Sequence, residues 1–149
     1  MKSTISIILV LFVSLSVCYA AKDKEHPKLP ETAIELIETL KKTEGSYTTW
    51  EVKLDYVTEK DLPRLVELLD SEEPCAYSVM SISSQLPAGR SNVGNEAAYL
   101  IESFWKRYYP TRLTSSESGI PKKEELKMWY RMWANLKNLA EQKDALDKK

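Results

Sequence analysis

The amino-acid sequence predicts an all-α domain of about five helices. Between residues 58 and 109, apolar side chains recur at spacings of three and four in three consecutive segments, which is the pattern of helices with one buried face. Short turns containing proline or glycine separate these segments. One further segment with the same periodicity lies on either side, so we expect the core to form between packed helices.

The first expected helix lies between Pro30 and Gly45. Proline suits the first position of a helix, and glycine can end one by taking the left-handed conformation. The apolar edge of this helix consists of Ala33, Ile34, Ile37 and Leu40.

Residues 49–57 are predicted to be an irregular or extended segment. Apolar and charged side chains alternate from Trp50 to Tyr56, as they do in a half-buried strand. Since no second strand is evident, such a strand would pair with an irregular segment such as residues 112–114 or lie over the helices as a connector. Trp50, Leu54 and Val57 also fit one face of a helix, so strand and helix both stay open.

The next three helices are expected in residues 58–70, 74–86 and 91–109. Thr58 and Asp61 have the spacing of a capping box, and Ser91 or Asn92 is expected to cap the third helix. Their apolar faces are Leu62, Leu65, Val66, Leu68 and Leu69 in the first, Cys75, Val79, Ile82 and Leu86 in the second, and Val93, Ala97, Leu100, Ile101, Phe104 and Tyr108 in the third.

The last expected helix runs from Pro121 to about Gln142. Its apolar side consists of Leu126, Trp129, Trp133, Leu136 and Ala140, with Met132 and Leu139 at the flanks. Residues 143–149 are expected to be a frayed polar tail.

Residues 1–20 have the pattern of a signal peptide. Lys2 precedes an apolar run that ends at Val17, and small residues before the expected cleavage after Ala20 complete the pattern. The run is shorter than the roughly 20 residues that span a bilayer, so we expect no retained transmembrane helix and a secreted or periplasmic protein. A lipid anchor at Cys18 is the alternative, which Val17 disfavours because the bacterial lipobox has a small residue there.

The remaining chain divides into a flexible linker at residues 21–30, a helical domain at 31–142 and the polar tail. After cleavage Cys75 is the one cysteine left, so no internal disulfide is expected. Its place in an apolar stripe predicts a small buried hydrophobic residue.

Composition and motifs exclude several functional classes. Twenty-one basic and 22 acidic side chains give a formal charge of -1, which does not suit a nucleic-acid partner. The single histidine, His26, lies in the linker, and no cysteine and histidine spacing indicates a metal site. We therefore expect no enzyme activity, no cofactor and no metal.

Two runs resemble the helices of a HEAT repeat. The run from Asp61 to Asp70 reads D-L-P-x-L-x-x-L-L-D, and the run from Val93 to Ile101 reads V-x-x-x-A-A-x-x-I. The family places an arginine after this valine, where the chain has Gly94. The W-Y-x-x-W run that starts at Trp129 is similar to the terminal helix of small exported HEAT-like proteins of bacteria. The resemblance implies a short right-handed stack of helices, an α-solenoid fragment that binds other proteins.

Six residues are candidates for contact with a partner. Arg90, Ser91 and Asn92 precede an expected helix N-terminus, where N-H groups and a cation could hold an anion. Trp105, Tyr109 and Tyr130 lie off the main apolar stripes and could form an aromatic contact surface. The resulting hypothesis is an exported, non-catalytic scaffold for an unknown protein partner. The alternative is an envelope glycan-binding module whose exposed aromatic rings stack on sugars.

Overall fold

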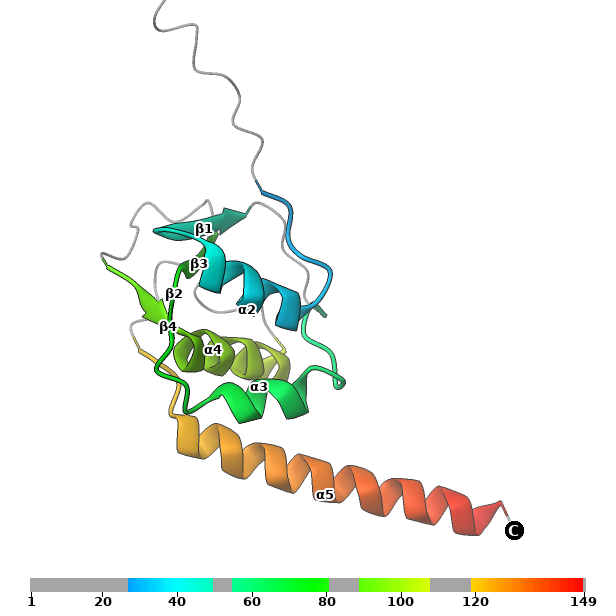
Figure 1. Ribbon diagram of the computed structural model, residues 1–149. Helices are drawn as coiled ribbons and strands as arrows, with labels where there is room; N and C mark the ends of the chain where they lie inside the picture. The colour runs from blue at the N-terminus through cyan, green and yellow to red at the C-terminus, as the bar shows by residue number, and fades with distance from the viewer. Residues whose placement is uncertain (1–26, 50–54, 81–88, 108–118, 149) are drawn as a thin grey trace, which may run out of the picture.

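The computed structural model describes residues 27–49, 55–80, 89–107 and 119–148, which form four helices and four short strands. The helices are α2 (Ala33–Lys42), α3 (Leu62–Leu68), α4 (Val93–Lys106) and α5 (Lys123–Asp147). The strands are β1 (Ser46–Thr49), β2 (Pro74–Cys75), β3 (Tyr77–Met80) and β4 (Ser91–Asn92). Figure 1 shows α2, α3 and α4 with the strands as one body, and α5 passing beside α3 and extending beyond it.

The strands form two small sheets, so the prediction of an all-α stack of about five helices is wrong. In one sheet β1 runs parallel to β3, with Ser46 opposite Tyr77. In the other, β2 is antiparallel to β4, with Cys75 opposite Ser91. The chain therefore combines helices with strands, and the strands position the start of α4.

The error arose in the segment predicted as a helix from Pro74 to Leu86. Cys75 and Val79 are both buried, as their shared stripe requires. A spacing of four residues keeps two side chains on one face of a strand as well as of a helix, because the side-chain period of a strand is two. Pairing with β1 and β4 then determined the conformation of residues 74–80. Ile82 and Leu86 lie outside the described residues.

The predicted extended segment at residues 49–57 is described only at Thr49 and at 55–57. Thr49 is the last residue of β1, which starts earlier than the alternation in the sequence suggested. Its partner among the described residues is β3. The predicted partner segment at 112–114 lies outside the described residues. Tyr56 and Val57 are buried in the core, and the Tyr56 hydroxyl donates to the Thr32 carbonyl at 2.7 Å.

A complete side-chain cap begins α2, whereas α3 follows a short hydrogen-bonded turn. The Thr32 hydroxyl accepts from the Glu35 N-H at 3.1 Å while the Glu35 carboxylate accepts from the Thr32 N-H, which is a complete capping box. Before α3, the Asp61 carboxylate accepts from the Thr58 N-H at 2.8 Å, as predicted, but the N-cap is Asp61 and not Thr58, and it makes no side-chain cap bond. The regular helix starts only at Leu62, one residue before Pro63.

The start of α4 is held against the end of α3. Asn92 caps α4 by accepting from the Asn95 N-H at 2.8 Å, which confirms the predicted cap. The Gly94 N-H donates to the Ser71 carbonyl at 3.0 Å. A β-carbon on Gly94 would lie 2.3 Å from the Leu69 carbonyl oxygen and 2.8 Å from that of Ser71. Only glycine permits this approach, at the position where HEAT repeats have arginine.

The core lies among α2, α3 and α4 and under the strands. It includes most of the apolar positions predicted for these helices, and Cys75 is buried in it as expected. Its largest fully buried side chains are Ile37, Leu40, Leu62, Leu65, Leu69, Ile101, Leu126, Val79, Val93, Thr49 and Cys75.

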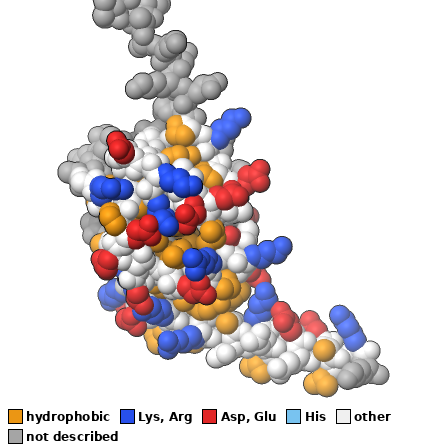
Figure 2. Space-filling view, in the orientation of Figure 1, with side chains coloured by type: hydrophobic (Ala, Val, Ile, Leu, Met, Phe, Trp, Pro, Cys, Tyr) orange, Lys and Arg blue, Asp and Glu red, His pale blue; other side chains and the backbone are white. Residues whose placement is uncertain are grey.

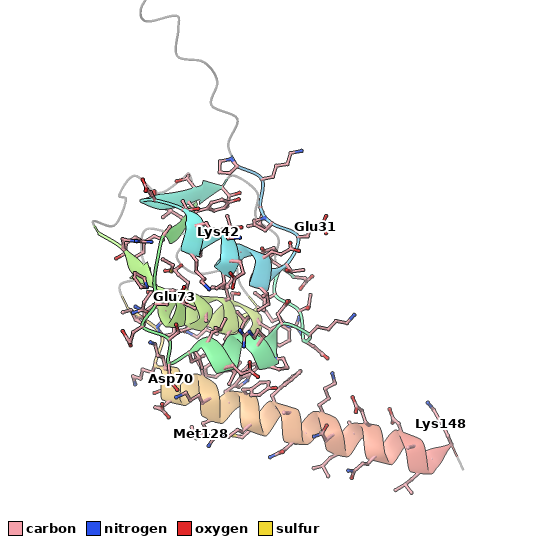
Figure 3. The ribbon with its side chains drawn as sticks, in the orientation of Figure 1. Glu31, Lys42, Asp70, Glu73, Met128 and Lys148 are labelled. Carbon is pink, nitrogen blue, oxygen red and sulfur yellow. The ribbon has the colours of Figure 1, made fainter. Side chains whose placement is uncertain are left out.

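The last helix is longer and less buried than predicted. It continues to Asp147, five residues past Gln142, and Leu126 is its one buried residue. Figure 3 shows Asp70 near the first turns of α5, Met128 on the side turned away from α3, and Lys148 at the far end. Among the described residues, no helix combines the length and the apolar character needed to cross a bilayer.

Candidate interaction surface

The candidates Arg90, Ser91 and Asn92 are used mainly to build the fold. Ser91 is buried in β4, and the Asn92 amide both caps α4 and donates to the Glu72 carboxylate at 3.4 Å. Arg90 is exposed, and its guanidinium donates to the Pro74 carbonyl at 3.5 Å. The structure thus brings the three residues together, with Ser91 buried, Asn92 half-buried and the Arg90 side chain exposed to solvent.

The second group of candidates belongs to an aromatic cluster between α4 and α5. Trp105 stacks on Trp129 with ring centroids 5.6 Å apart, and Tyr130 stacks on Trp133 at 5.9 Å. Trp129 and Trp133 are themselves stacked at 6.2 Å, which joins the two pairs into one row. Phe104 packs edge-on against Trp133. Tyr109 lies outside the described residues.

This aromatic cluster attaches α5 to the body more than it offers a free surface. Trp129, Tyr130 and Trp133 are half-buried and pack on the core. Trp105 is 40% exposed and is the member of the row that is open to solvent. The prediction that Trp129 and Trp133 face the core is therefore confirmed, while Tyr130 packs beside them.

Ion pairs attach α5 to the body on either side of the cluster. The Lys127 ammonium lies 2.8 Å from the Asp70 carboxylate at the end of α3 and 2.8 Å from Glu124. The hydrogen bond to Asp70 is the main reason that the pKa of Lys127 is raised, followed by the one to Glu124. One helical turn past Trp133, Lys137 pairs with Glu59, which raises the pKa of Lys137.

Beyond these contacts, α5 carries an exposed apolar row, which we call the α5 stripe. Each member has between 59% and 71% of its surface accessible to solvent. The α5 stripe consists of Met128, Met132, Leu136, Leu139 and Leu146. Figure 2 shows hydrophobic side chains along the part of the helix that extends from the body. An exposed apolar row of this kind on a rigid helix is typical of a surface that contacts another protein.

The sequence analysis missed the α5 stripe because it merged two faces of the helix into one. Leu126, Trp129 and Trp133 face the body; Leu136 was assigned to the same side, and Met132 and Leu139 to its flanks. At 3.6 residues per turn, however, Met128, Met132, Leu139 and Leu146 lie roughly 120° around the helix from the buried face. Leu136 lies on nearly the same side as Trp129 and is exposed because the body does not reach it. The spacings of four, four, three and seven from Met128 to Leu146 were the signal that could have separated the two faces.

Within the described residues, no group of three histidine, cysteine or acidic side chains could hold a metal ion. Burial raises the pKa of Tyr56, with smaller contributions from Tyr47, Asp61 and Glu35. This tyrosine hydrogen-bonds within the core and is not part of an open site.

Comparison with protein-family models, with curated proteins and with solved structures finds no match for this chain. The resemblance to HEAT repeats therefore depends on the sequence pattern alone.

Proposed function

We propose that this chain is an exported, non-catalytic protein-interaction module and that α5 is its contact element. The observation that carries the proposal is the α5 stripe, five large apolar side chains that the body leaves uncovered. An amphipathic helix that presents such a row is the usual ligand of an apolar groove or of a second helix.

The attachment of α5 to the body supports this role. The aromatic cluster and the Lys127 and Lys137 ion pairs hold the first half of the helix, so the second half is presented in one direction. A contact element that is already ordered loses less conformational entropy when it binds. The signal-peptide pattern of residues 1–20 supports export, and the lack of a catalytic signature in the sequence supports binding without chemistry.

Site-specific photo-crosslinking tests the proposal. A photoreactive amino acid replaces Met132 or Leu139 on the α5 stripe, and the control carries it at Lys42, an exposed position at the end of α2. We expect crosslinked products of higher mass from the two stripe positions and not from Lys42. Equal crosslinking at all three positions, or none at the α5 stripe, would contradict the proposed function.

The glycan-binding alternative is favoured by a separate observation, the exposed indole of Trp105. Its stacking on Trp129 holds the ring in place, and rigid exposed aromatic rings are suited to contact the apolar faces of sugars. This alternative predicts saturable quenching of tryptophan fluorescence by envelope glycans that Trp105→Ala abolishes. Met132→Ala leaves the aromatic cluster intact and is the control. Its tryptophan fluorescence should be quenched by the glycans as in the wild type.

A further inference from the structure

We propose that the α5 stripe packs against α5 of a second copy of this chain, with the two helices antiparallel and Glu125 beside Lys143 of the other copy. This inference rests on the proposed function and identifies the partner.

The heptad pattern of α5 supports pairing with another helix. Met132, Leu136, Leu139 and Leu146 are separated by four, three and seven residues, so they follow the seam of a coiled coil. Lys143 occupies the seam position between Leu139 and Leu146, and Glu125 occupies the one seven residues before Met132. The seam therefore has an acid near one end and a base near the other.

Charge complementarity selects the antiparallel arrangement. If Met132 of one copy lies beside Leu136 of the other, the residue numbers in each facing pair sum to 268, and Leu139 faces the half-buried Trp129. Glu125 then faces Lys143 at both ends of the pair, since 125 and 143 give the same sum. In a parallel pair Glu125 would face Glu125 and Lys143 would face Lys143, and like charges in this position are unfavourable.

The antiparallel arrangement also covers the uncovered part of the molecule. The second half of α5, which extends from the body of one copy, lies along the first half of α5 of the other copy. That first half is attached to the body of its own copy. The extending half is about the length at which an isolated helix is marginal in water, so a second helix beside it would stabilise it.

The area available fits a weak dimer. Burial removes on the order of 100 Å² from each large apolar side chain. In this register Met132, Leu136 and Leu139 of each copy lie against the other helix, which gives about 600 Å² in total and belongs to the class of weak, transient interfaces. We therefore expect dissociation between the high micromolar and the millimolar range.

Charge on α5 disfavours an anionic membrane as the occupant. Five basic and five acidic side chains lie between Lys123 and Asp147, so the helix has no net charge. Helices that lie on anionic membranes carry an excess of lysine and arginine on the polar face.

Sedimentation equilibrium of the full chain from low micromolar to millimolar concentration tests the proposal. We expect a monomer-dimer equilibrium that the double substitution Leu136→Glu and Leu139→Glu weakens at least 100-fold. Asn138→Glu adds a charge to the same helix outside the seam. It should keep the dissociation constant of the dimer within twofold of the wild-type value. Because these positions are exposed, circular dichroism of each variant should match the wild type.

A charge exchange tests the orientation. Glu125→Lys and Lys143→Glu should each weaken the dimer by about three- to tenfold, because each replaces two attractive pairs by repulsive ones. An equimolar mixture of the two variants restores both attractive pairs and should dimerise as tightly as the wild type. A mixture no tighter than either variant alone would overturn the antiparallel pairing.

A chain that stays monomeric throughout would overturn the inference. If the α5 stripe then crosslinks to a different protein, the proposed function stands without the self-pairing. If it crosslinks to nothing, both are wrong.

Discussion

Helices α3 and α5 are stabilised in opposite ways. The seven residues of α3 have no side-chain cap and no acidic residue in the first turn, yet Leu62, Leu65 and Leu69 around it are fully buried. The 25 residues of α5 place only Leu126 in the core. A helix as short as α3 depends on tertiary packing. The first half of α5 is held by the aromatic cluster and two ion pairs, and its second half extends from the body. Burial therefore identifies α3 as part of the fold and leaves a face of α5 for another purpose.

The largest difference in the free energy of unfolding should come from replacing one leucine by alanine in each of the two helices. Leu65→Ala removes a fully buried side chain from α3 and should lower the free energy of unfolding by about 2–5 kcal/mol. Leu136→Ala in α5 removes a side chain that is 65% exposed and should change the free energy of unfolding by less than about 0.5 kcal/mol. Urea denaturation at a concentration where the chain is monomeric measures both. Similar losses would show that α5 is packed as tightly as α3.

The contact between α3 and α4 can be tested at Gly94. Gly94→Ala should lower the free energy of unfolding by about 1–3 kcal/mol, because the added methyl group would overlap the Leu69 and Ser71 carbonyl oxygens. This outweighs the better helix propensity of alanine, which is worth at most about 1 kcal/mol. Gly119→Ala, just before α5, has open space around the added carbon and is the control. A more stable Gly94→Ala variant would mean that α3 and α4 lie farther apart.

Tyr56 provides a pH-dependent test of the body. Tyr56→Phe removes the hydrogen bond to the Thr32 carbonyl and should lower the free energy of unfolding at neutral pH by about 1 kcal/mol. Burial raises the pKa of Tyr56 in the folded protein, so the folded state keeps a proton that the unfolded state releases above about pH 10. The contribution of Tyr56 to the free energy of unfolding is complete below that pH and is lost as the pH rises further. The melting temperature of the wild type should therefore fall more steeply with pH in this range than that of Tyr56→Phe. Equal slopes would contradict the buried position of Tyr56.

The smallest effect is expected at the ion pair that holds α5. Lys127→Ala removes the contact with Asp70 and should lower the melting temperature slightly at low salt, with a smaller difference at high salt because exposed charges are screened. The control is Lys122→Ala, whose partner Glu125 belongs to α5 itself and does not connect it to the body. A salt-dependent difference between the two variants would show that the Asp70 contact attaches α5.

The candidate site could be predicted only in part. The sequence identified Trp105 as an aromatic residue off the apolar stripes, and the structure places it at the open end of the aromatic cluster. It also singled out Ser91, whose side chain is buried because β4 pairs with β2. Whether Trp105 and Ser91 are exposed depends on segments that are distant in the sequence. Local spacing could therefore not distinguish the exposed residue from the buried one.

Local interactions determined α2, the cap of α4 and the existence of α5 from the sequence alone. Thr32 with Glu35, and Asn92 with Asn95, act within one helical turn, so their spacing can be read from the sequence without knowing which distant segments become neighbours. Tertiary structure decided that residues 74–80 are strands and that Leu136 and Leu139 face solvent. Both outcomes follow from which segments become neighbours: β1 and β4 supplied hydrogen-bond partners for residues 74–80, and the body ends before the second half of α5.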